Sequence, residues 1–263
     1  MNSTLALKKA DYEAEVGDFL GFGRGSAQGE EEWTTDKATK IRMDVASGLR
    51  RFYWCGHPWS FLKPLAALTL KDGDSTVDLP DDFGGIDNGA RVTVTTSSNA
   101  YTTILGFVSP VIVKQAHSEN QDAEGFPELI AQRPVKNMAP GRMQTSELYV
   151  YPTADQEYTL TFPYYFNPNY LTDVSPYVYG GIEHHEAILE CCLAVAEMRR
   201  DGMVGVHAQE ALRLLGVSIG MDKRKQPTRL GYNHDRSDEV YSDEYGRQVT
   251  TTGGVRINGT LYT

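Results

Sequence analysis

The side chains best suited to chemistry gather at one point of the sequence, where two adjacent histidines are flanked by glutamates. The run is Glu183-His184-His185-Glu186, followed by Glu190. A zinc hydrolase helix would carry His-Glu-x-x-His and a di-iron bundle would repeat Glu-x-x-His on two helices, and neither string occurs. Because acidic residues at a helix start complement the positive end of the helix dipole, we expect a solvated or inter-subunit helix start. Replacing both histidines by glutamine should then leave folding intact.

A glycine-rich loop and a cysteine pair are the other candidates for ligand binding or catalysis. The loop at residues 21–25 superficially looks like a dinucleotide-binding turn, but no strand precedes it and its spacing is not Gly-x-Gly-x-x-Gly. Cys191 and Cys192 fall in the apolar centre of a predicted helix, where cysteine behaves as a small hydrophobic residue. No string combines a nucleophile or metal, a positioned base and an orienting group, so we expect no catalytic site, no metal and no cofactor.

The charge balance argues against nucleic-acid binding. The chain has 35 Asp and Glu against 25 Lys and Arg, a net charge of −10. Affinity for phosphate backbones rests largely on Lys and Arg, so DNA in contact with this chain is expected to slide past it. Aromatic residues cluster at 53–54 with 59, and at 164–166 with 170. No Lys or Arg interleaves with the second cluster, which favours core or subunit-interface packing over base stacking.

Length and composition are those of a globular protein made in a reducing compartment. The 263 residues, 40% of them hydrophobic, are enough for a substantial core. No apolar run approaches the roughly 18 residues of a membrane-spanning helix. The three cysteines imply no disulfide framework, which fits the cytoplasm.

Hydrophobic periodicity predicts helices at both ends of the chain and strands between them. Helical spacing is found at residues 4–20, 36–54, 182–200 and 205–222. The third of these segments is apolar on more than one side, so it should be covered by two neighbours, with Leu193 fully buried. Asp201-Gly202 is expected to end it.

The middle of the chain changes to short β-branched and aromatic runs separated by turn residues. Predicted strands lie at residues 76–79, 91–95, 101–105, 111–113, 147–151 and 158–162. We expect the last two to form a hairpin and the block to form a small antiparallel sheet or sandwich. Residues 21–32 are expected to be a mobile loop, and residues 116–140 a long loop or insertion.

These elements predict an α+β architecture, with a bundle of about four helices, a β-rich insertion domain and an extended C-terminal arm. The predicted divisions are residues 1–64 and 167–226 for the bundle, 65–166 for the insertion and 227–263 for the arm. The arm has isolated apolar residues and no core of its own, so we expect it to become ordered only on a partner. Residues 255–262 alternate loosely and could add as a strand to a partner's sheet.

Four strings stand out within this order of elements. They are Trp59-Ser60-Phe61-Leu62-Lys63-Pro64, Val77-Asp78-Leu79-Pro80-Asp81-Asp82-Phe83, Tyr151-Pro152-Thr153-Ala154-Asp155 and Leu214-Leu215-Gly216-Val217-Ser218-Ile219-Gly220-Met221-Asp222. Together they resemble the head-to-tail adaptor (connector) proteins of tailed bacteriophages, and are similar to the podovirus tail tubular protein A family. The resemblance covers roughly residues 35–235.

The resemblance implies a structural virion protein rather than an enzyme. Such a protein forms a ring of twelve copies beneath the portal, joins capsid to tail at the head-tail junction and lines the DNA conduit. The implied partners are the portal protein, tail or nozzle proteins and other copies of the chain. We expect the arm to contact the portal or a neighbouring subunit through Tyr241, Tyr245, Arg247, Val255, Ile257, Leu261 and Tyr262.

Two alternatives stay open from the sequence. The chain could be a tail or neck component that anchors fibres or a stopper. It could also be a metal-dependent hydrolase that uses His184 and His185 together with His207.

Overall fold

The protein is a mixed α+β molecule, which confirms the predicted fold class. Its structure is a computed structural model that describes residues 3, 5–86, 90–96, 103–135, 144–225, 255–257 and 260–262. The helices are α1 (Lys9–Phe19), α2 (Thr35–Tyr53), α3 (Pro110–Glu119), α4 (His185–Asp201) and α5 (Val206–Lys225), with short 3-10 turns at η1 (Ser26–Gln28), η2 (Ser60–Leu62) and η3 (Ile182–His184).

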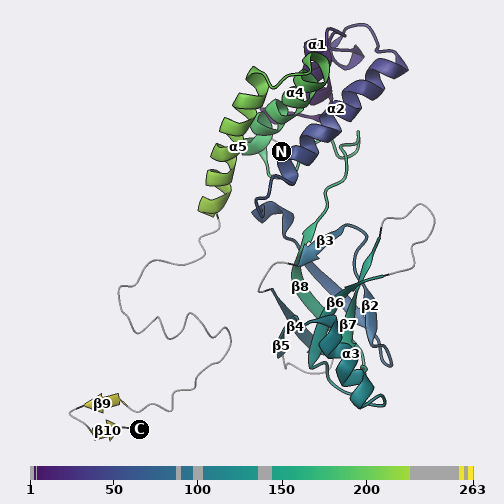
Figure 1. The fold of residues 1–263 in the computed structure, drawn as a ribbon, viewed down its shortest axis with the longest axis vertical. Coiled ribbons are helices and arrows are strands. Elements are labelled where there is room, and N and C mark those ends of the chain that lie inside the picture. The colour runs from purple at the N-terminus through teal and green to yellow at the C-terminus, as the bar shows by residue number, and fades with distance from the viewer. Residues whose placement is uncertain are drawn as a thin grey trace. The chain divides into compact units, whose positions relative to one another are not determined.

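Helix α4 is the centre of a helical bundle made from both ends of the chain. It packs against α2 on one side and α5 on the other, and α1 contacts both α2 and α4 (Figure 1). The apolar stripe of α2 supplies Ile41, Val45, Leu49 and Phe52 to the core. Burial of such a stripe, rather than helix propensity alone, stabilises helices of this length. The four predicted helices of the bundle are confirmed, with their ends shifted by a few residues.

The contact between α2 and α4 is unusually close at one point. A Cβ added to Gly48 would lie 2.5 Å from the Cα and Sγ of Cys192. Cys192 is fully buried and Cys191 is 5% exposed, so both cysteines pack in the core as predicted. Burial raises the pKa of the Cys191 thiol to about 12, which leaves this thiol protonated and unreactive at neutral pH.

Leu193 lies on the doubly covered helix and is 8% exposed, close to the full burial that was predicted. We expect Leu193→Ala to lower the free energy of unfolding by about 2 kcal/mol, the low end of the range for buried leucines, because the site lies near the edge of the core. Chemical denaturation of the monomer measures this. A change below about 0.5 kcal/mol, the scale of ordinary surface substitutions, would mean that the site is not packed in solution.

The strands form two antiparallel sheets around a second core. One sheet has the order β1-β8-β4-β5 with β3 paired to β8, and the other has the order β2-β7-β6 (Figure 1). Inward side chains such as Leu70, Val92, Leu148 and Phe162 are buried together. The strands are β1 (Leu65–Leu70), β2 (Thr76–Asp78), β3 (Phe83–Ile86), β4 (Arg91–Thr96), β5 (Thr103–Gly106), β6 (Leu129–Pro134), β7 (Ser146–Tyr151) and β8 (Tyr158–Phe166).

Three sequence predictions for the β-region are wrong. β7 and β8 do not form a hairpin, because β7 pairs with β2 and β6 while β8 pairs with β1, β3 and β4. The run at 111–113 is helical, since Ser109 caps α3 by accepting a hydrogen bond from Val111 N, and Pro110 occupies the first turn. Of the long loop or insertion expected at 116–140, the loop is wrong, because the interval holds the end of α3 and all of β6.

The C-terminal residues 226–263 form a separate unit. Its described part is a two-stranded antiparallel pair, β9 (Val255–Ile257) and β10 (Thr260–Tyr262). The expected single strand is therefore divided into two strands that pair with each other. Asn-Gly between alternating runs is the strongest short-range signal for a hairpin, and residues 258–259 carry it. Tyr241, Tyr245 and Arg247 lie outside the described residues.

Candidate interaction surface

His184 is enclosed by aromatic rings in the core of the bundle. It is 1% exposed, and its ring centroid lies 5.3 to 5.9 Å from those of Phe52, Trp59 and Phe61. Its Nδ1 has no hydrogen-bond partner among the described residues. Burial lowers the pKa of His184 below its ordinary value, because the charged imidazolium is poorly solvated there.

His185 is also buried, at 3% exposure, and holds the N-terminal segment. Its Nδ1 accepts a hydrogen bond of 2.7 Å from the backbone N–H of Leu7, so the neutral ring is the form that binds. Burial, and then the neighbouring His184, lower the pKa of His185. The expectation of a solvated or inter-subunit helix start is therefore wrong for both histidines, since the packing that buries them lies within the chain.

The two histidines should make the bundle sensitive to acid. Their folded-state pKa values lie below the ordinary value, so the unfolded chain binds more protons as the pH falls through about 6.5, and stability is lost in that direction. We expect the melting temperature to fall between pH 7.5 and 5. The double variant His184→Phe, His185→Gln should lose part of that slope, since phenylalanine suits the aromatic cage and the glutamine oxygen can accept from Leu7. An unchanged slope would contradict the assignment.

The remaining candidates for metal or acid-base chemistry are engaged in pairwise contacts. His207 Nδ1 lies 2.9 Å from a carboxylate oxygen of Glu190, and Lys225 pairs with Glu183 at 2.7 Å. Within the described residues, no three His, Cys, Asp or Glu side chains come close enough together to hold a metal ion. The arrangement of these groups supports helix packing and no ligand set.

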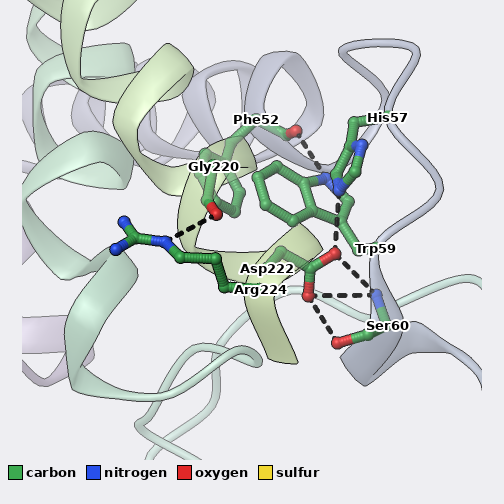
Figure 2. Close-up of polar contacts among 7 residues, drawn as sticks. All are labelled: Phe52, His57, Trp59, Ser60, Gly220, Asp222 and Arg224. Carbon is green, nitrogen blue, oxygen red and sulfur yellow. Dashed lines mark hydrogen bonds and ion pairs between the residues drawn. The ribbon is translucent and has the colours of Figure 1, made fainter. Parts of the chain in front are cut away.

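Asp222 makes the densest polar contact in the bundle (Figure 2). This carboxylate, 2% exposed on the last turn of α5, accepts hydrogen bonds from the backbone N–H of Ser60 at 3.1 and 3.3 Å and also from the Ser60 hydroxyl. His57 Nε2 lies 2.8 Å from Oδ2 of the same carboxylate. Burial alone would raise the pKa of Asp222, but the hydrogen bonds from Ser60 and His57 outweigh it and hold the pKa below its ordinary value.

The Asp222 cluster joins serine, histidine and aspartate, but its geometry is structural. In a hydrolytic triad the histidine lies between serine and aspartate and takes the serine proton. Here the aspartate lies between Ser60 and His57, so the imidazole is not placed to activate the hydroxyl. Trp59 packs beside the cluster and donates its indole N–H to Phe52 O at 3.2 Å (Figure 2). The cluster thus fixes the end of α5 to the segment that leads from α2 into the β-region.

Three of the strings that suggested an adaptor have structural roles at such junctions. The first and the last meet at Ser60 and Asp222. In the second string, Asp82 directly precedes β3. Its carboxylate accepts a hydrogen bond from the Tyr164 hydroxyl at 3.1 Å, and its backbone carbonyl accepts one from Asn167 N–H at 2.7 Å. Sequence reasoning found these strings by resemblance alone, because their partners lie more than eighty residues away.

The most exposed large aromatic side chain of the bundle is Trp54, at the end of α2. It is 54% exposed and stands between two clefts, of about 490 Å³ and about 120 Å³, both of which Tyr53 also lines. Tyr165 and Phe166 line the larger cleft, and Tyr170 lines the smaller one. The two aromatic clusters of the sequence thus meet at one surface, and exposed tryptophans beside pockets are typical of protein interfaces.

A family model described as SU10 adaptor protein matches residues 11–231. The chain belongs to the SU10 adaptor protein family. The match runs from α1 to just beyond α5 and so takes in the bundle and both sheets. A comparison with curated proteins gives no match. The narrower likeness to tail tubular protein A stays a prediction.

Membership of the SU10 adaptor family gives the chain a structural role as a phage adaptor rather than a catalytic one. An adaptor works by binding other virion proteins, so its functional features are surfaces such as the one around Trp54. None of the described helices is both long and apolar enough to span a bilayer.

Proposed function

We propose that the chain is a head-to-tail adaptor that assembles as a ring of twelve copies beneath the portal and links capsid to tail. The observation that carries the proposal is the adaptor-family match over residues 11–231. In this role the chain binds the portal on one side and tail or nozzle proteins on the other, at the head-tail junction of the virion. DNA passes through the ring without specific binding, which suits a chain of net charge −10.

The outward face of α5 supports assembly into a ring. Leu212 is 71% exposed and Val217 is 41% exposed, and a Cβ added to Gly216 or Gly220 would meet nothing within 4 Å. Glycine inside a helix costs about 1 kcal/mol relative to alanine, and no close contact with the described residues requires it at these two positions. Close approach of a neighbouring subunit would account for glycines and apolar side chains on one face.

The C-terminal arm is the proposed contact with the portal or a neighbouring subunit. Residues 1–64 and 167–226 would then act as the ring-forming bundle, residues 65–166 as an insertion domain and residues 227–263 as the arm. The residues assigned to this contact are Tyr241, Tyr245, Arg247, Val255, Ile257, Leu261 and Tyr262.

Electron microscopy of the chain with the portal of the same phage tests this function. We expect rings that stack on the portal, and loss of portal binding when the chain ends after residue 226. Leu212→Asp should prevent rings without lowering the melting temperature, while Ile112→Asp, which places the same charge at an exposed apolar position on α3, serves as its matched control. Full-length protein that stays monomeric and never binds the portal would contradict the proposal.

A further inference from the structure

Helix α2 carries a stripe of exposed side chains, interrupted by the half-buried Ser47, on the side opposite its buried face. Lys40, Met43, Ser47, Arg50 and Trp54 recur at intervals of three and four residues, so they share one face of the helix. Met43 is 56% exposed and Trp54 is 54% exposed. We call this set the Trp54 stripe.

The exposed charges of α2 are mostly basic, although the chain as a whole is acidic. The exposed charged residues of α2 comprise five cations and one anion, and five minus one gives +4 in a chain of net charge −10. Cations beside exposed aromatic and thioether side chains favour a partner that is both acidic and aromatic. These charged residues are Asp36, Lys37, Lys40, Arg42, Arg50 and Arg51.

The Trp54 end of the stripe also has room for side chains of a partner. The cleft of about 120 Å³ is lined by Arg50, Trp54 and Tyr170 among others, and Trp54 also lines the cleft of about 490 Å³. A large aromatic side chain beside a pocket, with arginine next to it, is the usual composition of an interface hot spot.

The matching chemistry occurs in the C-terminal segment of the chain itself. Residues 235–245 hold five acids and one base, so their net charge is five negative and one positive, or −4. The same segment contains Val240, Tyr241 and Tyr245. We infer that residues 235–245 of a second copy bind along the Trp54 stripe, with Tyr241 at the clefts and the acids on Lys40, Arg50 and Arg51.

The second copy, rather than the same chain, is favoured by the proposed ring. The described bundle ends at Lys225, three residues after Asp222, which binds Ser60 close to the Trp54 end of α2. The nine residues from 226 to 234 can span about 30 Å at full extension, which is long enough to leave the bundle for a neighbour. Contacts between two different surfaces of identical subunits are the kind that close a ring. The inference therefore rests on the proposed assembly and names the contact within it.

A mixed disulfide between two different full-length chains tests the contact. Cys55 follows Trp54 and is half-buried, whereas Cys191 and Cys192 are buried and do not compete. One chain carries Tyr241→Cys with Cys55→Ser, and the other keeps Cys55. A disulfide needs Cα atoms within about 7 Å of each other. We therefore expect the disulfide-linked heterodimer to form about tenfold faster with the Tyr241→Cys chain than with a control chain that carries Thr252→Cys and Cys55→Ser.

Charge reversal tests the ionic part of the same contact. Arg50→Glu with Arg51→Glu in the chain that keeps Cys55 should abolish the rate advantage of position 241. Glu239→Lys with Asp243→Lys in the Tyr241→Cys chain should restore it.

Equal rates for positions 241 and 252 would overturn the inference. So would cross-linking found only within single chains when Tyr241→Cys is placed in a chain that keeps Cys55. Electron microscopy of the same samples distinguishes this failure from failure of the proposed function. Rings that form without a selective cross-link would overturn only the docking of residues 235–245 on the Trp54 stripe. Unmodified chains that form no rings and bind no portal would overturn the adaptor assembly itself.

Discussion

Replacing Asp222 by alanine is expected to lower the free energy of unfolding by about 4 kcal/mol, because it leaves several buried polar groups without their partner. The Ser60 N–H, the Ser60 hydroxyl and His57 all contact this carboxylate, which is 2% exposed. Asp222→Asn should lose less, since an amide oxygen still accepts from Ser60. Denaturant unfolding of the two variants measures the difference.

Glu210→Ala provides the control for Asp222. Glu210 lies on the same helix, but its ion pair with Arg213 is exposed, so the melting temperature should not change measurably. If Asp222→Ala behaved like Glu210→Ala, the junction between α5 and the segment around Ser60 would not be formed in solution.

Gly48→Ala should lower the free energy of unfolding by about 3 kcal/mol, the upper end for overpacking, because the added methyl group meets backbone rather than a flexible side chain. The new Cβ would lie 2.5 Å from Cys192 Cα and 2.6 Å from Cys192 N, so α2 and α4 must separate. Thermal or denaturant unfolding measures the loss.

Gly216→Ala is the matched control for Gly48, since it makes the same change inside a helix with open space around the new methyl group. It should stabilise the isolated chain by about 0.5 to 1 kcal/mol through helix propensity. Equal effects at the two positions would show that the close approach of α2 and α4 is not maintained in solution. Because Gly216 faces the proposed neighbour, the same variant should also weaken ring formation.

The long helices could be predicted from the sequence because their apolar stripes recur over several turns. The apolar spacing of α2 and the two-sided apolar pattern of α4 specify both the helices and their buried faces. Short strands carry less information. The runs that form β7 and β8 show strand periodicity, but periodicity does not say which sheet a strand joins. The Ser109-Pro110 start of α3 and the Asn258-Gly259 hairpin signal were present in the sequence, and β-branched or alternating composition outweighed them.

The site could be predicted only in part, because its contacts join distant residues. The histidine pair looked solvated since glutamates flank it, whereas the rings that enclose His184 come from residues 52–61. The partners of Asp222 lie more than 160 residues earlier in the chain. Trp54 was recognised as one of an aromatic group, but its exposure between two clefts depends on residues 165–170.

A cryo-electron microscopy reconstruction of the virion that carries this chain would show whether the chain is a head-to-tail adaptor. We expect a ring of density beneath the portal into which the bundle of α1, α2, α4 and α5 fits, with density for the two sheets in the same subunit. A virion whose head-tail junction contains no such bundle, or in which the chain is found in the tail fibres, would contradict it.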